Sequence, residues 1–223
     1  MRAHWSEAKN HLEHAKPYWS YEDIGVFFLV LVILGLVLRL FVRFYLLPRS
    51  EVTNPSGLLQ FAVVASLNLA LYLVLKFRHH QAVLRPLGWV WPSTPYIVVT
   101  LLGGISLALG VVLYFRFRNQ SAPPMAVMQM LFLGLLLGPI LEESFFRGCV
   151  LPLLAQTTGS GTAVILTAIL FALFHQPADV AHWESFTITG VAYGWIRVSS
   201  RSTAAAAVMH AMYNLAVFLS AMG

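Results

Sequence analysis

Residues 125–154 read MAVMQMLFLGLLLGPILEESFFRGCVLPLL. Apolar side chains fill this run almost completely, and the run exceeds the roughly 20 residues that a helix needs to cross a bilayer. It nevertheless contains two adjacent carboxylates, Glu142 and Glu143, followed by Arg147. An ionised side chain is costly in hydrocarbon, so a chain that keeps three of them there has a use for them. The stretch therefore predicts a membrane helix that carries a functional site.

The spacing of these three residues assigns them different surroundings. Arg147 follows Glu143 by four residues, which places both on one helix face, where the guanidinium can neutralise the carboxylate. Glu142 points about 100° away around the helix and has no cationic partner in the same segment. We therefore expect Glu143 to be held in an ion pair and Glu142 to be available for chemistry.

The composition places the whole chain in a membrane. Of its 223 residues, 58% are hydrophobic and only 10% are charged, whereas soluble domains carry about 25% charged residues. The net charge is +5, but the basic residues flank apolar segments, as topology determinants and lipid head-group contacts do, which argues against a nucleic-acid groove. The chain has a single cysteine, so an internal disulfide framework and a CxxC metal site are excluded.

Apolar runs separated by turn signals predict an all-α fold, a polytopic membrane bundle of about seven to eight transmembrane helices. Gly138 and Pro139 interrupt the longest run and predict a kink or break just before the glutamates. The candidate spans are residues 24–47, 58–77, 96–115, 125–154, 162–175, 186–198 and 204–222.

Two later segments add polar residues at the same spacing of four. Residues 171–175 read FALFH and residues 210–214 read HAMYN, so His175 lies one turn after a phenylalanine and His210 one turn before Asn214. A carboxylate takes a proton from water, and an imidazole shares or relays that proton. A second imidazole and an amide donate hydrogen bonds to an oxyanion. The set therefore suits hydrolysis inside a membrane.

Each motif also has a purely structural interpretation. An ion pair inside a membrane often clamps two helices, and a membrane histidine or asparagine often hydrogen-bonds a neighbouring helix. Cys149 lies seven residues after Glu142, on nearly the same face, but a small cysteine packed between helices is more typical than a thiol nucleophile. The joint presence of all three motifs favours the functional interpretation.

Together the three motifs resemble the CPBP family of intramembrane proteases, which includes type II CAAX prenyl endopeptidases and the Abi-like bacteriocin-processing and immunity proteins. The family signature of two glutamates, three residues and an arginine is intact, as are its Phe-x-x-x-His and His-x-x-x-Asn motifs. The resemblance covers roughly residues 125–222. It is extended by residues 146–148 (FRG), 151–153 (LPL) and 190–195.

The resemblance implies a role for each site residue. Glu142 and His175 would activate a water, and His210 with Asn214 would form the oxyanion site. Glu143 and Arg147, the pair that the spacing predicts, would support the site structurally. The chain then divides into a polar N-terminal segment (1–23), N-terminal transmembrane helices (24–124) and a CPBP-type catalytic core (125–223).

We expect no cofactor. The family was long described as metal-dependent, and Glu142, His175 and His210 are residue types that hold zinc. However, the sequence has no His-Glu-x-x-His, and Asn214 is a poor zinc ligand. If the reaction depends on a metal, those three residues are the expected ligands.

The expected function is that of an intramembrane endopeptidase acting on a membrane-anchored protein or peptide, with or without an attached lipid. Membrane lipids are the other expected partner, and nucleic acid is not expected. The short chain favours a prokaryotic inner membrane. A non-enzymatic immunity or partner-binding protein remains an alternative, as does a proton-coupled transporter, although no internal repeat supports transport.

Overall fold

All regular structure in the described part of the chain is helical, which confirms the all-α prediction. The computed structural model contains no strand among these residues. It describes residues 12–13, 17–46, 66–67, 69–77, 84–118, 130–175 and 177–222.

Three of the helices are long and apolar enough to cross a membrane: Tyr21–Phe44, Thr94–Phe117 and Thr203–Met222. A shorter apolar helix covers Ser160–Phe174. The chain is therefore an integral membrane protein, as its composition predicts. The expected total of seven to eight spans stays a prediction, because the described residues supply these three full-length candidates and no more.

The chain forms two compact units, Trp19–Val83 and Met1–Tyr18 with Leu84–Gly223. In the smaller unit, α2 (Tyr21–Phe41) continues as the π-helical turn η1 (Val42–Leu46). A capping box starts α2: the Asp23 N–H donates to the Ser20 hydroxyl, and the Ser20 N–H donates to the Asp23 carboxylate. Of the predicted span at 58–77, residues 66–67 and 69–77 are described, and they are helical.

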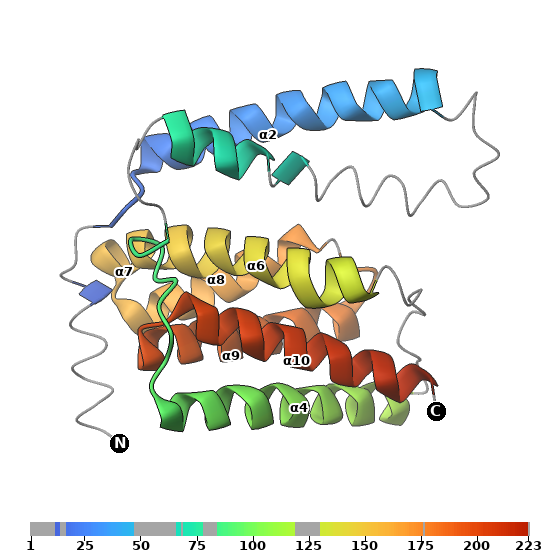
Figure 1. Ribbon diagram of the computed structural model, residues 1–223. Coiled ribbons are helices and arrows are strands. Elements are labelled where there is room, and N and C mark those ends of the chain that lie inside the picture. The colour runs from blue at the N-terminus through green and yellow to red at the C-terminus, as the bar shows by residue number, and fades with distance from the viewer. Residues whose placement is uncertain are drawn as a thin grey trace. The chain divides into compact units, whose positions relative to one another are not determined.

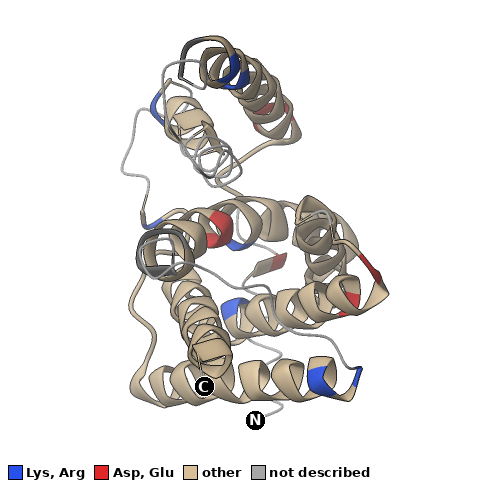
Figure 2. Ribbon diagram, turned by 90° about the vertical axis from the view of Figure 1, so that its right-hand side faces the viewer, with Lys and Arg blue, Asp and Glu red and all other residues tan. Residues whose placement is uncertain are grey.

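The larger unit contains the remaining helices, in which α10 packs along α4 and α8 along α9 (Figure 1). Charged residues are few on these helices (Figure 2). Their bounds are α4 (Thr94–Phe117), η3 (Met130–Leu137), α6 (Gly138–Glu143), η4 (Ser144–Val150), α7 (Leu151–Thr158), α8 (Ser160–Phe174), α9 (Val180–Ser200) and α10 (Thr203–Met222).

The long apolar run is a continuous helical path from η3 to α7. Helical backbone angles continue through Leu137 and Val150, where the pattern changes between π and α turns. The chain therefore does not break at Gly138 and Pro139; the hydrogen-bonding pattern changes there instead. The path ends at Gly159, whose φ of +80° suits a residue without a side chain.

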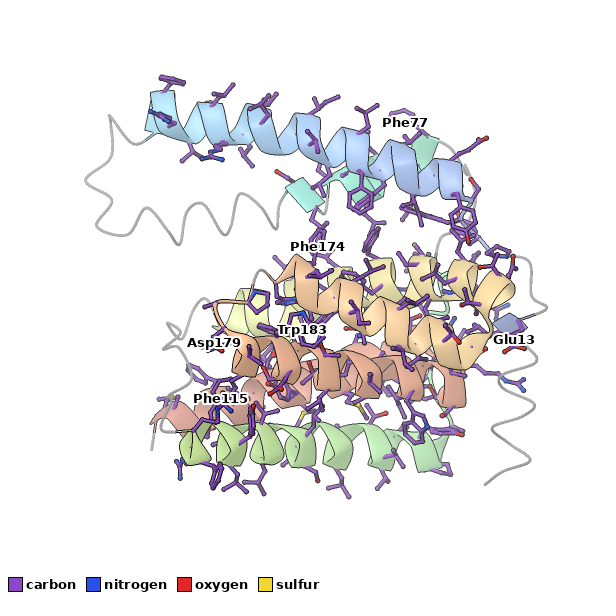
Figure 3. The ribbon with its side chains drawn as sticks, turned by 180° about the vertical axis from the view of Figure 1, so that it is seen from behind. Glu13, Phe77, Phe115, Phe174, Asp179 and Trp183 are labelled. Atoms are coloured by element: carbon purple, nitrogen blue, oxygen red, sulfur yellow. The ribbon has the colours of Figure 1, made fainter. Side chains whose placement is uncertain are left out.

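The helix α9 is longer than the predicted span at 186–198, because it begins at Val180. The Asp179 carboxylate caps it by accepting the His182 N–H at 2.9 Å. The first turns are polar, which hides this helix start from a hydropathy pattern. They lie against the end of α4, where the Phe115 and His182 rings are 4.8 Å apart (Figure 3). The Tyr114 hydroxyl also donates to Glu184 there.

The packing of α4 on α10 depends on a glycine. A Cβ on Gly104 would lie 2.6 Å from the Met209 carbonyl oxygen and 3.2 Å from the Tyr213 nitrogen, both backbone atoms of α10. A side chain at this position would force the two helices apart. Gly110, two turns further along α4, has nothing within 4 Å of that position.

Gly104→Ala should therefore lower the melting temperature of the detergent-purified protein. Overpacking costs typically ~1–3 kcal/mol, against which the better helix propensity of alanine returns up to ~1 kcal/mol. Gly110→Ala is the matched control and should melt at or above the wild-type temperature. Identical melting of the two variants would contradict the close packing of α4 on α10.

Candidate active site

The two adjacent glutamates face different surroundings. Glu143 is the last residue of α6, and Arg147 lies in η4; both side chains are fully buried. Arg147 Nη1 donates to Glu143 Oε1 at 3.1 Å, so the contact predicted from the spacing is present. The Glu142 side chain is instead partly exposed, at 21%, although its Oε2 is buried.

Arg147 joins three helices around this ion pair. Its Nη2 donates to the Gly190 carbonyl of α9 at 2.8 Å. Its guanidinium carbon lies 4.8 Å from the ring centre of Phe171 on α8 and 5.3 Å from that of Tyr193 on α9. These contacts combine a charged hydrogen bond with cation–π attraction, so Arg147 fixes η4 relative to α8 and α9.

His210 shares the same carboxylate oxygen. Its Nδ1 lies 3.0 Å from Glu143 Oε1, and its ring stacks on Tyr193 at 4.7 Å with 18° between the planes. An ionised carboxylate only accepts hydrogen bonds, so the proton of this contact belongs to Nδ1. In a neutral His210, Nε2 then carries the lone pair. Glu143 therefore orients a histidine as well as an arginine.

Glu142 pairs with the other histidine of the set. Glu142 Oε2 lies 3.6 Å from His175 Nε2, and the two side chains are 21% and 25% exposed. His175 Nδ1 donates to the Phe171 carbonyl at 2.8 Å, which leaves Nε2 directed toward the glutamate. The imidazole also stacks on Phe186, with ring centres 4.4 Å apart and 26° between the planes.

The Glu142–His175 spacing suits a shared water. A distance of 3.6 Å is too long for a direct hydrogen bond, but a water placed about 2.8 Å from each atom would bond to both. Glu142 Oε2 has no hydrogen-bond partner in the protein, so it has the capacity to accept one. A carboxylate and an imidazole arranged in this way can take up and pass on a proton.

Asn214 lies one turn after His210 on α10 and reaches a different element. Its Nδ2 donates to the Gly134 carbonyl of η3 at 2.8 Å. A primary amide has two N–H groups, so one donor remains after this bond. The sequence motif therefore places His210 and Asn214 on one helix, while each side chain is held by a different part of the long helical path.

The three expected metal ligands do not gather around one point. Among the described residues, which include all three, no group of three His, Cys, Asp or Glu side chains has the arrangement to hold a metal ion. Glu142 and His175 come together, but His210 Nδ1 faces Glu143. These donors thus do not fit a three-ligand zinc site in the observed arrangement. The expectation that no cofactor is needed stays a prediction.

Several residues of the site were not identified from sequence. Tyr193 stacks on His210, Phe186 stacks on His175, and Gly190 supplies a carbonyl to Arg147. Tyr193 and Gly190 fall within residues 190–195, a stretch that resembles the family. That resemblance could have identified both residues as part of the site. No sequence pattern pointed to Phe186, because its ring contacts His175 only through the packing of α9 on α8.

A family model matches the segment of the chain that contains these residues. Residues 123–216 match a family model described as Rce1-like, type II CAAX prenyl endopeptidase Rce1-like. The matched segment includes all six residues of the candidate site, so the predicted resemblance is confirmed. Comparisons with curated proteins and with solved structures give no match.

The geometry predicts that replacing Glu143 lowers the stability of the protein and that replacing Glu142 does not. Glu143→Gln removes the charge that balances the fully buried Arg147, and breaking a buried pair costs roughly 3–5 kcal/mol. We expect a melting temperature lowered by several degrees or more in detergent. Glu142→Gln, the adjacent and isosteric control, should melt within one or two degrees of wild type, since Glu142 Oε2 has no hydrogen-bond partner in the protein and the change breaks no fully buried ion pair. Equal losses in the two variants would contradict the assignment of Glu143 as the structural glutamate.

Proposed function

We propose that the protein is an intramembrane endopeptidase, because residues 123–216 match a family model described as Rce1-like, type II CAAX prenyl endopeptidase Rce1-like. It hydrolyses a peptide bond of a membrane-associated protein or peptide. The observation that carries the proposal is the distance of 3.6 Å between Glu142 Oε2 and His175 Nε2, on two side chains that are 21% and 25% exposed.

In the proposed reaction Glu142 is the general base. It takes a proton from a water, and the water oxygen forms a bond to the scissile carbonyl carbon while the carbonyl oxygen becomes an oxyanion. His175 holds the water through Nε2. When the oxyanion collapses, the carbon–nitrogen bond breaks and the proton passes to the leaving amine. Atoms and charge balance without another reactant.

The burial of Glu143 supports the choice of Glu142. Glu143 has no exposed surface, and its Oε1 accepts hydrogen bonds from both Arg147 and His210. Proton transfer to Glu143 would remove the charge that balances a buried guanidinium. Glu142 forms no ion pair with Arg147, so its protonation would not leave that guanidinium unbalanced.

We assign the oxyanion site to His210 and Asn214. Asn214 has one N–H left after its bond to Gly134. His210 offers Nε2 as a donor only when it carries both ring protons, and its Nδ1 then donates to Glu143 Oε1. A protonated His210 gives a charge-assisted hydrogen bond, which is stronger than a neutral one. The negative oxygen is thus paired with a positive donor.

The proposed substrate is anchored in the membrane, with or without a prenyl or other lipid, and the proposed location is a prokaryotic inner membrane. Helices around the site expose large apolar side chains, as a membrane protein's lipid-facing surface does. A substrate held in the same bilayer would reach Glu142 and His175 without leaving the lipid.

Glu142→Gln should abolish turnover of a synthetic peptide ending in a prenylated Cys-a-a-X sequence, or of another membrane-anchored peptide that the wild type cleaves. The change removes the base and keeps the shape of the side chain. Mass spectrometry of the products in detergent or liposomes measures cleavage. The control is Glu22→Gln, a change of the same type on α2 in the smaller unit, which should keep wild-type turnover. Full activity of Glu142→Gln would eliminate the proposed base, and a wild type that cleaves none of these peptides would favour a partner-binding protein.

Removal of metal should leave turnover unchanged. The proposed reaction uses a carboxylate base and hydrogen-bond donors, so no Lewis acid takes part. Cleavage should persist after prolonged incubation with EDTA or 1,10-phenanthroline. Loss of activity that zinc restores, together with about one zinc per chain that His175→Ala removes, would replace the base mechanism with a zinc mechanism.

A further inference from the structure

Away from the glutamates, two turns are joined into one rigid junction. The turn at residues 84–90 precedes α4, and the turn at residues 201–202 connects α9 to α10; both lie at the end of the unit where α10 begins (Figure 1). The Thr203 N–H donates to the Gly88 carbonyl at 2.8 Å. The Thr203 hydroxyl donates to the Leu87 carbonyl, and the Ser202 hydroxyl to the Val90 carbonyl. These bonds fix the two turns to each other.

A buried arginine lies at this junction. Arg197, near the end of α9, has only 6% of its surface exposed. A Cβ on Gly88 would lie 2.7 Å from Arg197 Nη2, so the guanidinium occupies the space of the missing side chain. Gly88 also has a φ of +77°, which other residues rarely adopt. The turn is therefore shaped to receive the guanidinium.

Arg197 has no carboxylate partner among the described residues. Its described hydrogen bond runs from Nε to the Arg147 carbonyl oxygen at 3.2 Å, which uses one of five N–H groups. The ion pairs of the described chain involve Glu142, Glu143 and Asp179 and none involves Arg197. The Nε hydrogen bond ties Arg197 to the backbone of η4. It leaves the two Nη groups without an assigned anion.

Two exposed arginines flank the same junction. Arg85 opens the first turn, where its carbonyl accepts the Gly88 N–H at 2.9 Å. Arg201 ends α9 in a left-handed conformation, with φ of 57°, two residues before Thr203. Neither forms an ion pair with a described carboxylate. Three arginines thus lie in or next to the two joined turns, and none of them forms an ion pair with a described carboxylate.

The junction lies at the ends of two candidate membrane spans. It sits where α4 and α10 begin, and both helices are candidate membrane spans. Trp91, next to the first turn, is 74% exposed, and tryptophan is enriched at the level of the lipid head groups. Basic pockets between membrane helices at this depth bind anionic head groups.

We propose that Arg197, with Arg85 and Arg201, forms a binding site for the phosphodiester group of an anionic phospholipid. The guanidinium of Arg197 would bind two phosphate oxygens through its Nη groups, while the exposed arginines contribute charge around it. The acyl chains would lie along the apolar surface near Trp91. The site is separate from the proposed peptidase chemistry and does not depend on it.

Native mass spectrometry of the intact protein tests the proposal directly. The protein, released from a neutral detergent, is titrated with dioleoyl phosphatidylglycerol and, separately, with dioleoyl phosphatidylcholine. We expect a saturable adduct of one phosphatidylglycerol per chain and weaker, non-saturating binding of phosphatidylcholine. Equal affinity for the two lipids would overturn the site, because both carry a phosphodiester and only the first has a net negative charge.

Variants locate the binding. Arg197→Gln should weaken phosphatidylglycerol binding about tenfold or more, as expected for loss of a charge-assisted hydrogen-bond pair. This variant also loses the hydrogen bond from Arg197 Nε to the Arg147 carbonyl oxygen. The double variant Arg85→Gln/Arg201→Gln keeps that bond and provides a second test. It should weaken phosphatidylglycerol binding severalfold. The control with the same change in charge is Arg116→Gln/Arg118→Gln at the other end of α4, which should bind like wild type. Unchanged binding in the first two variants would overturn the proposal.

Inorganic phosphate separates a lipid site from a site for a free anion. At millimolar concentration it should neither displace phosphatidylglycerol nor raise the melting temperature of the wild type. Displacement of the lipid by phosphate, with equal stabilisation by both, would assign the arginines to a soluble anion and overturn the lipid proposal.

Discussion

The cost of burying Glu143 in a low-dielectric environment governs the rest of the site. The carboxylate has no exposed surface, so its charge must be balanced within the protein. Arg147 and His210 both direct N–H groups at its Oε1, at 3.1 and 3.0 Å. Arg147 in turn requires the Gly190 carbonyl and the rings of Phe171 and Tyr193, so one buried charge brings η4, α8, α9 and α10 into a fixed arrangement.

This arrangement explains how two neighbouring carboxylates serve different purposes. The negative charge of Glu143 is balanced within the core, while the adjacent Glu142 is partly exposed, faces His175 and keeps an oxygen without a hydrogen-bond partner. Rings stack on both histidines, Tyr193 on His210 and Phe186 on His175, and restrict their orientation. A site held in this way needs little rearrangement to polarise a bound water, which is the property that makes preorganised sites effective.

The sequence predicted local features well and tertiary contacts poorly. The spacing of four between Glu143 and Arg147 predicted their contact, because helix geometry alone brings such residues together. The attachment of His210 to Glu143 and of Asn214 to Gly134 depends on how α10 lies against α6 and η3, which no local pattern encodes. The start of α9 was missed because its polar first turns break the hydropathy pattern. The π turns around the glutamates also left no signal in the residue spacing.

The central claim, that Glu143 and not Glu142 is coupled to His210, is tested most directly by a double-mutant cycle on the free energy of unfolding in detergent micelles. The cycle combines His210→Ala with Glu143→Gln and, in parallel, with Glu142→Gln. Residues in direct contact show coupling energies of about 0.5–3 kcal/mol, whereas independent residues add within about 0.5 kcal/mol. The account predicts clear coupling for the Glu143 cycle and additivity for the Glu142 cycle. Coupling of His210 to Glu142, with additivity at Glu143, would contradict it.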